Sequence, residues 1–114
     1  MDTPERALSE DRSGYGLGFN IEHVIYLNKW SYGQVAEQMY PGELPDGPNR
    51  LSARKELAQV IDRKQKRWRR HLPALARAWN LPEAVLLFDD LRRCATLNDL
   101  EQHYGFRRLD VIKR

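Results

Sequence analysis

The feature that most constrains this chain is a stripe of apolar side chains at helical spacing within its most basic segment. If residues 52–70 are placed at about 100° per position, as in an α-helix, several side chains fall within about 60° of Leu57. These are Ala53, Val60, Ile61, Lys64 and Trp68. The opposite side collects Lys55, Gln59, Asp62, Arg63, Lys66, Arg69 and Arg70. The segment is therefore predicted to form one amphipathic helix, capped by Ser52, with a cationic outer face.

Positive charge is concentrated in the same segment. Residues 50–70 contain nine Lys or Arg against two acidic residues, a net charge of +7, whereas the whole chain of 114 residues carries +3. The remainder of the chain is therefore acidic, at −4. This asymmetry favours a surface that faces a polyanion. The plainer alternative is a solvated charged face that only keeps the protein soluble.

Length and cysteine content indicate a single intracellular domain. A chain of 114 residues that is 41% hydrophobic is long enough to bury a core without disulfides. The single cysteine, Cys94, cannot form an internal disulfide, and the three histidines do not combine with it into a zinc spacing. No apolar run approaches the roughly 20 residues that cross a bilayer, and the N-terminus lacks a signal-like apolar stretch. We expect a cytoplasmic protein with no cofactor, metal or membrane contact.

Local capping signals predict further helices around the basic segment. Asn20 can cap a helix that continues to about Trp30. Ser31 with Gln34 three residues later forms a capping-box pattern ahead of a short helix at 32–40. The stretch "PGELPDGPN" then breaks the helical pattern. Later helices are expected in "LPALARAW" up to Asn80, in "LPEAVLLFDDLRR" with Pro82 in its first turn, and from Thr96 to Gly105. The fold class is all-α, with five to six helices in a compact domain.

Three segments are expected along the chain. Residues 1–18 are rich in acids and serine and end in "GYGLG", which is typical of a flexible lead-in. Residues 19–93 hold the main domain, and residues 94–114 hold a C-terminal helix and a basic tail. The tail after Gly105 fits a short helix or a strand, and "TLNDLEQHYGFRRLDVIKR" also allows a second helix-turn-helix there.

The order of these elements resembles the phage-repressor-like (lambda-repressor-like) helix-turn-helix family, often called the XRE family. "WSYGQVAEQMY" looks like the second helix of that family, with Ala36 at its small packing position. "HLPALARAWNLPEAVLLFDD" looks like the closing pair of helices. Together these stretches and the helix between them cover about 60 residues. The resemblance implies a small transcriptional regulator that binds double-stranded DNA, of the kind that phages and other mobile elements encode.

The resemblance also implies roles for individual residues. Leu57 and Val60 would face the second helix, and Gln34 would touch a phosphate. The base-reading side chains would come from the start of the long third helix, at Arg54, Lys55 and Gln59. Family members usually dimerise, and the helix from Thr96 is the candidate surface. The remaining phosphate contacts are expected from Arg50, Arg63, Lys64, Lys66, Arg67, Arg69 and Arg70.

Two departures separate this chain from the family pattern. Tyr40 stands where the tight turn normally has a glycine, and about eleven extra residues, "PGELPDGPNRL", separate the second and third helices. The glycine that usually follows the recognition helix is also absent, so the third helix is expected to continue to Arg70. These departures bear on the angle between the two helices and on how far the basic face extends.

Other functional classes have weaker support. His23, His71 and His103 are not paired with a plausible nucleophile, and Cys94 beside two arginines lacks a partner base, so no enzyme activity is expected. Asp89, Asp90 and Glu83 lack the loop spacing of a metal site. The three tryptophans, Trp30, Trp68 and Trp79, are expected to meet in the core, with base stacking by Trp68 as the alternative. Two other partners stay open for the basic helix: an acidic protein surface, as for a small inhibitor or adaptor, and RNA.

Overall fold

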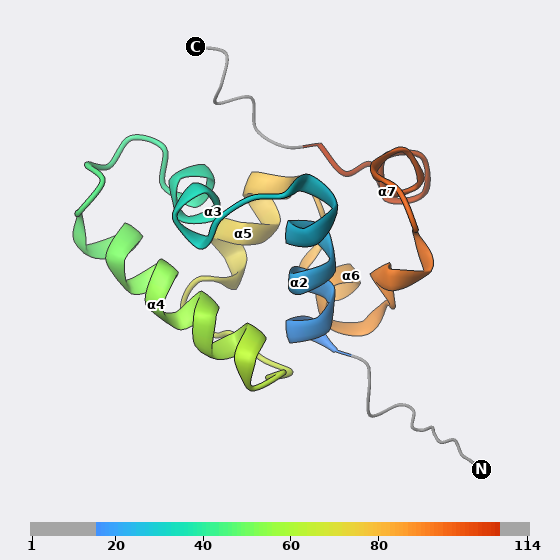
Figure 1. Cartoon of the computed structure of the whole chain (residues 1–114), viewed down its shortest axis with the longest axis horizontal. Helices are drawn as coiled ribbons and strands as arrows, with labels where there is room; N and C mark the ends of the chain where they lie inside the picture. Colours follow the sequence, from blue (N-terminus) through green and yellow to red (C-terminus); the bar gives the residue numbers. More distant parts are fainter. Residues whose placement is uncertain (1–15, 108–114) are drawn as a thin grey trace.

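A computed structural model of the chain describes residues 16–107, and within them all regular structure is helical. Figure 1 shows the elements as a compact group of short helices. In chain order they are α2 (Leu17–Asn28), α3 (Tyr32–Met39), α4 (Pro48–Asp62), α5 (Leu72–Trp79), α6 (Glu83–Phe88), the 3-10 helix η1 (Leu91–Arg93) and α7 (Leu97–Tyr104). The expected all-α class is confirmed for the described residues. The element expected after Gly105 lies almost entirely outside them.

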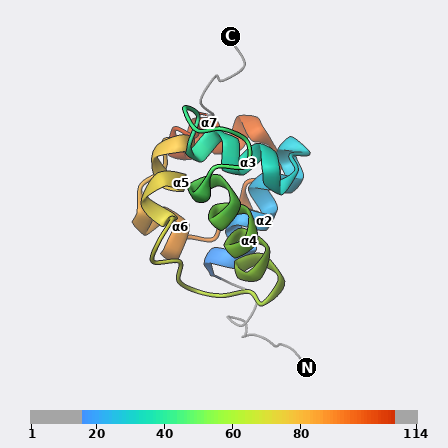
Figure 2. The same ribbon diagram turned by 90° about the vertical axis from the view of Figure 1, so that its left-hand side faces the viewer.

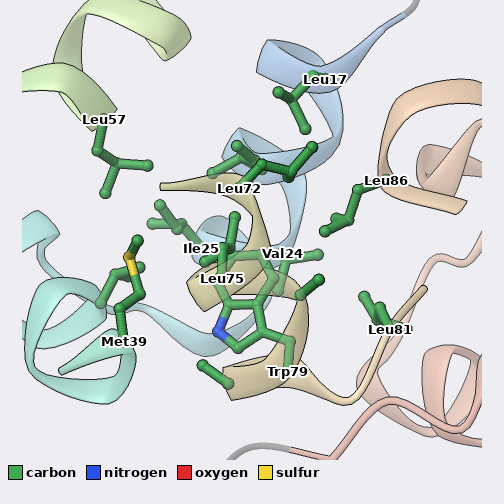
Figure 3. Packing of buried hydrophobic residues seen from close by; sticks show 14 of the residues in the cluster. Leu17, Val24, Ile25, Met39, Leu57, Leu72, Leu75, Trp79, Leu81 and Leu86 are labelled. Carbon is green, nitrogen blue, oxygen red and sulfur yellow. The ribbon is translucent and has the colours of Figure 1, made fainter. Parts of the chain in front are cut away.

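One apolar core joins all the helices. Helix α2 packs against α4, α6, η1 and α7, while α3 packs against α4 and α5. Figure 3 shows Val24, Ile25 and Leu75 around Trp79, with Met39 of α3 and Leu57 of α4 farther out on one side of the cluster. Leu17 and Leu100, near the two ends of the described chain, are fully buried in the same cluster. The core therefore includes residues on both sides of position 94.

Helix α2 begins earlier than the capping signal predicted. Its first residue is Leu17 and its N-cap is Gly16, whose φ of 136° suits glycine. Asn20 is not a cap of its own helix. It is fully buried, and its side-chain amide donates to the carbonyls of Leu86 and Asp89 at 2.8 and 2.7 Å while its Oδ1 accepts from the Leu91 amide at 2.9 Å. Asn20 thus satisfies the carbonyls that the end of α6 leaves unpaired.

The glycines of "GYGLG" that the structure describes, Gly16 and Gly18, are packing positions. A Cβ atom on Gly18 would lie 2.5 Å from the Val60 carbonyl oxygen and 2.8 Å from the Lys64 Cα. The Gly18 amide also donates to the Gln65 carbonyl at 2.9 Å. The first turn of α2 therefore touches the end of α4, and the prediction of a flexible lead-in up to residue 18 is wrong for Leu17 and Gly18.

Helix α3 forms as predicted. The Ser31 side chain accepts from the Gln34 amide at 3.1 Å, and the Gln34 side chain accepts from the Ser31 amide at 2.8 Å. This reciprocal capping box satisfies two amides at the start of the helix. The helix ends at Met39, with Tyr40 as its C-cap.

Helix α4 starts four residues before the predicted cap at Ser52. It begins at Pro48 after Gly47, and the Glu43 carboxylate accepts from the backbone amides of Asn49 (3.1 Å) and Arg50 (2.6 Å). The carboxylate therefore serves as a cap from within the preceding loop, which runs from residue 40 to 47 and is shorter than the sequence suggested. In return, the Arg50 guanidinium donates to the carbonyls of Tyr40 and Pro41, at 2.9 and 3.1 Å. These bonds fix the end of α3 to the start of α4.

Helix α4 also ends eight residues earlier than predicted. The helix stops at Asp62 and not at Arg70, because Lys64 adopts a left-handed conformation with φ 50°. The chain then turns back along α4 and reaches α5 (Figures 1 and 2). Trp68 is buried beside Glu56, to which its indole N–H donates at 3.0 Å. A continued helix would have carried Trp68 beyond the core, whereas the reversal buries its ring and satisfies its N–H.

The C-terminal elements match their signals in part. Asn80 ends α5 in the left-handed conformation, Thr96 caps α7, and Gly105 ends it with φ 75°, all as predicted. The helix expected from Leu81 to residue 93 is shorter: α6 ends at Phe88 and η1 follows as a separate turn. After Gly105, Phe106 returns to the core and is 3% exposed. The start of this tail therefore packs on the domain, and the Arg107 amide donates to the Trp79 carbonyl at 3.1 Å.

All three tryptophans contribute to the core, but they do not form one cluster of rings. Trp30 and Trp79 stack with centroids 5.9 Å apart, and Phe106 lies against both. Trp68 instead packs edge-on against His71, at 5.6 Å. Because Trp68 is only 5% exposed, it offers little surface for stacking on a base.

Candidate nucleic-acid interface

The basic residues after α4 form a strip that runs antiparallel to the helix. We use "basic strip" for residues 63–70. Its pairing with α4 is set by three contacts: Gln65 donates its amide to the Val60 carbonyl (2.9 Å), Trp68 bonds Glu56, and Arg70 donates to Ser52 Oγ (3.2 Å). The strip is therefore held to α4 at three points along its length, and the Arg70 side chain lies against Ser52 and Glu56 of that helix.

The three predicted base-reading side chains lie on α4 and are exposed. Lys55 and Gln59 are one turn apart on the side opposite the buried Leu57 and Ala53. Arg54 lies about 100° away from Lys55, on the edge that faces the start of α3. A Cβ on Gly33 of α3 would lie 3.8 Å from the Arg54 guanidinium, which places these two elements side by side.

The predicted phosphate-binding residues divide into two groups. Arg63, Lys66, Arg67 and Arg69 are exposed and have no ion-pair partner within residues 16–107. The others are engaged. Arg50 bonds the loop carbonyls described above, Lys64 pairs with Glu22 at 2.8 Å, Arg70 lies 3.5 Å from Glu56, and the Gln34 oxygen belongs to the capping box.

A polar network that the sequence did not reveal lies beneath the strip. His71 is 1% exposed, with its Nδ1 2.6 Å from the Tyr40 hydroxyl and its Nε2 3.0 Å from Ser52 Oγ. Ser52 also donates to Glu56 at 3.2 Å. The single hydroxyl proton of Ser52 is used in the bond to Glu56, so the Ser52 oxygen must accept from His71 Nε2–H. The other ring nitrogen, Nδ1, then accepts from the Tyr40 hydroxyl. The only sequence signal for this network is the Ser52 and Glu56 pair at i, i+4 spacing.

The network also sets the charge states of its members. Burial lowers the pKa of His71; the Glu56 carboxylate opposes this effect and the Arg70 guanidinium adds to it. For Glu56, burial alone raises the pKa, but hydrogen bonds from Trp68 and Ser52 and the charges of Arg70 and His71 outweigh burial. The net result is a pKa of Glu56 below its ordinary value. At neutral pH the network therefore holds a neutral imidazole and an ionised carboxylate.

A hollow of about 440 Å³ opens between α4 and the basic strip, and we name it the α4 hollow. It contains two cations, one carboxylate, two amides and one hydroxyl beside apolar side chains. It is lined by Leu51, Ser52, Lys55, Glu56, Gln59, Val60, Gln65, Trp68 and Arg70. Two of the predicted base-reading residues, Lys55 and Gln59, therefore share this hollow with Arg70 of the strip.

A second hollow, of about 430 Å³, lies on the other side of the strip. Its apolar wall includes Leu72, Leu87 and Phe88, and the Phe88 ring is 69% exposed. Arg67 and Arg69 stand at its rim. The basic strip thus separates a mixed polar hollow from an apolar one.

The residues weighed for catalysis or metal binding are dispersed. His23 bonds the Cys94 carbonyl at 2.7 Å, His71 belongs to the network above, and His103 is exposed on α7. Burial raises the pKa of the Cys94 thiol, so the two arginines before it do not activate it. No group of three or more His, Cys, Asp or Glu side chains in residues 16–107 could hold a metal ion. Among the helices of that same range, none combines the length and the apolar character that a membrane span needs.

No protein-family model, curated protein or solved structure matches this chain.

Proposed function

We propose that the protein binds double-stranded DNA in a sequence-dependent way and regulates transcription, with α4 in the major groove. The observation that carries this proposal is the joint arrangement of α4 and the basic strip. Helix α4, capped by Glu43, presents Lys55 and Gln59, and the strip that runs antiparallel to it carries four exposed cations without an ion-pair partner in the described chain.

Base reading is assigned to the outer face of α4. The helix has 15 residues, and at 1.5 Å per residue it extends over about 22 Å, while the major groove is about 12 Å wide and admits one α-helix. Gln59 can pair with the N6 and N7 edge of an adenine, and Lys55 or Arg54 with the O6 and N7 edge of a guanine. Each such contact is worth about 1–3 kcal/mol of discrimination between bases.

Phosphate contact is assigned to the basic strip. The exposed cations that lack an ion-pair partner within residues 16–107 would neutralise backbone charges, with Gln34 at the start of α3 as a further contact. They are Arg63, Lys66, Arg67 and Arg69. Three other cations would add to the positive electrostatic potential of the surface without contacting a phosphate directly, because existing bonds hold their side chains in place. They are Arg50, Lys64 and Arg70. Four phosphate contacts predict that the binding constant falls by about a hundredfold between about 50 and 200 mM salt.

The pair α3 and α4 would act as the helix-turn-helix of a repressor-like regulator. The segment between them is longer than the usual 3–4-residue turn, and the bonds of Glu43 and Arg50 are proposed to replace the missing tight turn in setting the angle between the helices. Dimerisation through α7 would place two copies of α4 on successive half-sites. A protein of this kind fits the regulators of phages and mobile elements.

Selection of bound duplexes from a random pool tests the proposal. For Lys66→Ala we expect weaker binding to all sequences and a salt slope reduced by about one unit. For Gln59→Ala we expect a relaxed or altered sequence preference with a similar salt slope. Arg93→Ala, an exposed arginine on η1, is the matched control and should behave as the parent protein does. Failure of every duplex to bind at low salt would sink the proposal.

A specific observation favours one alternative, a protein-binding adaptor or inhibitor. The exposed Phe88 ring beside Arg67 and Arg69 offers both an apolar anchor and a positive rim to an acidic partner surface. Phe88→Ala separates the two functions, because it removes the anchor and leaves the strip and α4 intact. We expect unchanged duplex binding in this variant. Loss of duplex binding would instead show that Phe88 belongs to the DNA-binding surface.

A further inference from the structure

We propose that the α4 hollow is a binding site for one nucleotide, a nucleobase together with its phosphate. The inference goes beyond duplex recognition, since a base within a paired duplex cannot enter a hollow. Its basis is the chemistry of the walls. With Lys55 and Arg70 positive and Glu56 negative, the lining carries a net charge of +1, which suits a ligand with one anionic group and a neutral hydrogen-bonding part.

The two cations belong to opposite walls. Lys55 is on α4, and Arg70 is on the basic strip, where its guanidinium is held by Ser52 and Glu56 at 3.2 and 3.5 Å. Arg70 is therefore pre-positioned, and a phosphate between the two walls would meet both cations. The ionised Glu56 keeps Arg70 in this orientation. Its negative charge also repels a ligand that carries several anionic groups.

The polar groups match the edge of a base. Gln59 and Gln65 each offer an amide donor and an amide acceptor from opposite walls. Glu56 already accepts from the Trp68 indole and from Ser52, yet a carboxylate has about four acceptor positions, so capacity remains for the amino group of a base. These are the acceptor and amide groups that proteins use to recognise base edges.

Size and apolar surface agree with the same ligand. A volume of about 440 Å³ lies within the roughly 300–1,000 Å³ range of small-molecule sites. Leu51, which is 44% exposed in the unliganded protein, supplies an apolar contact for the face of a base. A simple sugar phosphate would leave this side chain in contact with water.

Two sources can supply such a ligand: a free mononucleotide, or an unpaired nucleotide within a strand. Their shared chemistry is a base and a phosphate, and the test separates them. If the proposed DNA function also holds, a free nucleotide would compete with duplex DNA, because Lys55 and Gln59 take part in both.

Titration of the full chain, followed by nitrogen and proton NMR, tests the site. The probes are the four nucleoside 5′-monophosphates, the matching nucleosides, inorganic phosphate and a short single-stranded oligonucleotide. The Trp68 indole N–H reports on the hollow, whereas the Trp79 indole N–H, bonded to Gln38 at 2.9 Å in the core, is an internal control. We expect saturable shifts at Trp68 and at residues 51–70 with at least one monophosphate, and none at Trp79. Whichever probe binds with the higher affinity, the single-stranded oligonucleotide or the free mononucleotide, identifies the source of the ligand.

Variants make the result specific. Gln65→Ala should weaken nucleotide binding by about fivefold, as for the loss of one neutral hydrogen bond, and leave duplex binding unchanged because Gln65 is outside the proposed DNA contacts. Arg70→Ala should weaken it by roughly tenfold or more, with Arg93→Ala unchanged. Binding of phosphate as tight as that of every nucleotide, or no saturable shift at Trp68 with any probe, would overturn the nucleotide site. Duplex binding is scored separately, so either proposal can fail alone.

Discussion

Replacing Gly18 by alanine should destabilise the fold, although alanine is normally the better helix residue. A Cβ at this position would lie 2.5 Å from the Val60 carbonyl oxygen and 2.8 Å from the Lys64 Cα, where ordinary van der Waals contact needs 3.4–4 Å. Both obstacles are backbone atoms. They cannot move aside as the end of a flexible side chain can, so α2 must separate from α4 by about 1 Å.

The expected loss of stability combines two destabilising contributions and one stabilising contribution. Overpacking of this kind costs about 1–3 kcal/mol. The separation also weakens the bond from the Gly18 amide to the Gln65 carbonyl, worth about 1 kcal/mol, while the helix propensity of alanine returns at most about 1 kcal/mol. The net loss is about 2 kcal/mol, which lowers the Tm of a domain of this size by about 10 °C.

Thermal and urea unfolding followed by circular dichroism measure the effect. Gly42→Ala is the matched control, since no atom lies within 4 Å of a Cβ placed there, and its stability should stay within about 0.5 kcal/mol of the parent. A Gly18→Ala variant that melts at or above the parent temperature would refute the close contact between α2 and α4. A drop in both variants would point to glycine as such and not to this contact.

Two further predictions concern the caps and the buried histidine. Glu43→Ala should lower the free energy of unfolding by about 1 kcal/mol, because it removes the side-chain acceptor at the start of α4; Glu37→Ala, exposed on α3, is the control, and equal stability of the two in urea would contradict the cap. His71 has a lowered pKa in the fold, so the unfolded chain binds its proton first, and stability should fall as pH drops below about 6.5 until the folded pKa is passed. Urea midpoints between pH 7.5 and 5 should show a shallower slope for His71→Gln, and identical slopes would show that another group titrates.

Local capping signals predicted the start of α3 and both ends of α7, whereas the signal at Asn20 did not mark the start of α2. Ser31 with Gln34, Thr96 and Gly105 are the signals that succeeded, and each one satisfies backbone groups within four residues of itself. The ends of α4 differ because distant atoms decide them. Glu43 caps it from a loop, and the burial of Trp68 against Glu56 is favourable only when the chain reverses after Asp62.

Helical periodicity predicted burial better than it predicted helix length. Ala53, Leu57, Val60 and Ile61 are all buried as the stripe requires. Trp68 is buried too, but through the reversal of the chain and not as part of the same helix. The polar contacts of Tyr40, Ser52 and His71 could not be foreseen, since these residues are far apart in sequence and meet only when α3, α4 and the strip have packed.

The reversal after Asp62 frees the basic strip from the rules of helical sequence. On a helix, each added residue would rotate every following cation by about 100° and carry it away from the side that we propose contacts DNA. The strip is instead bonded to α4 at Gln65, Trp68 and Arg70. Between these residues its backbone has only to connect one bonded position with the next. The charges between those bonded positions can therefore change during evolution without altering the core. In the DNA-binding function that we propose, affinity and base preference would then be tuned on separate segments.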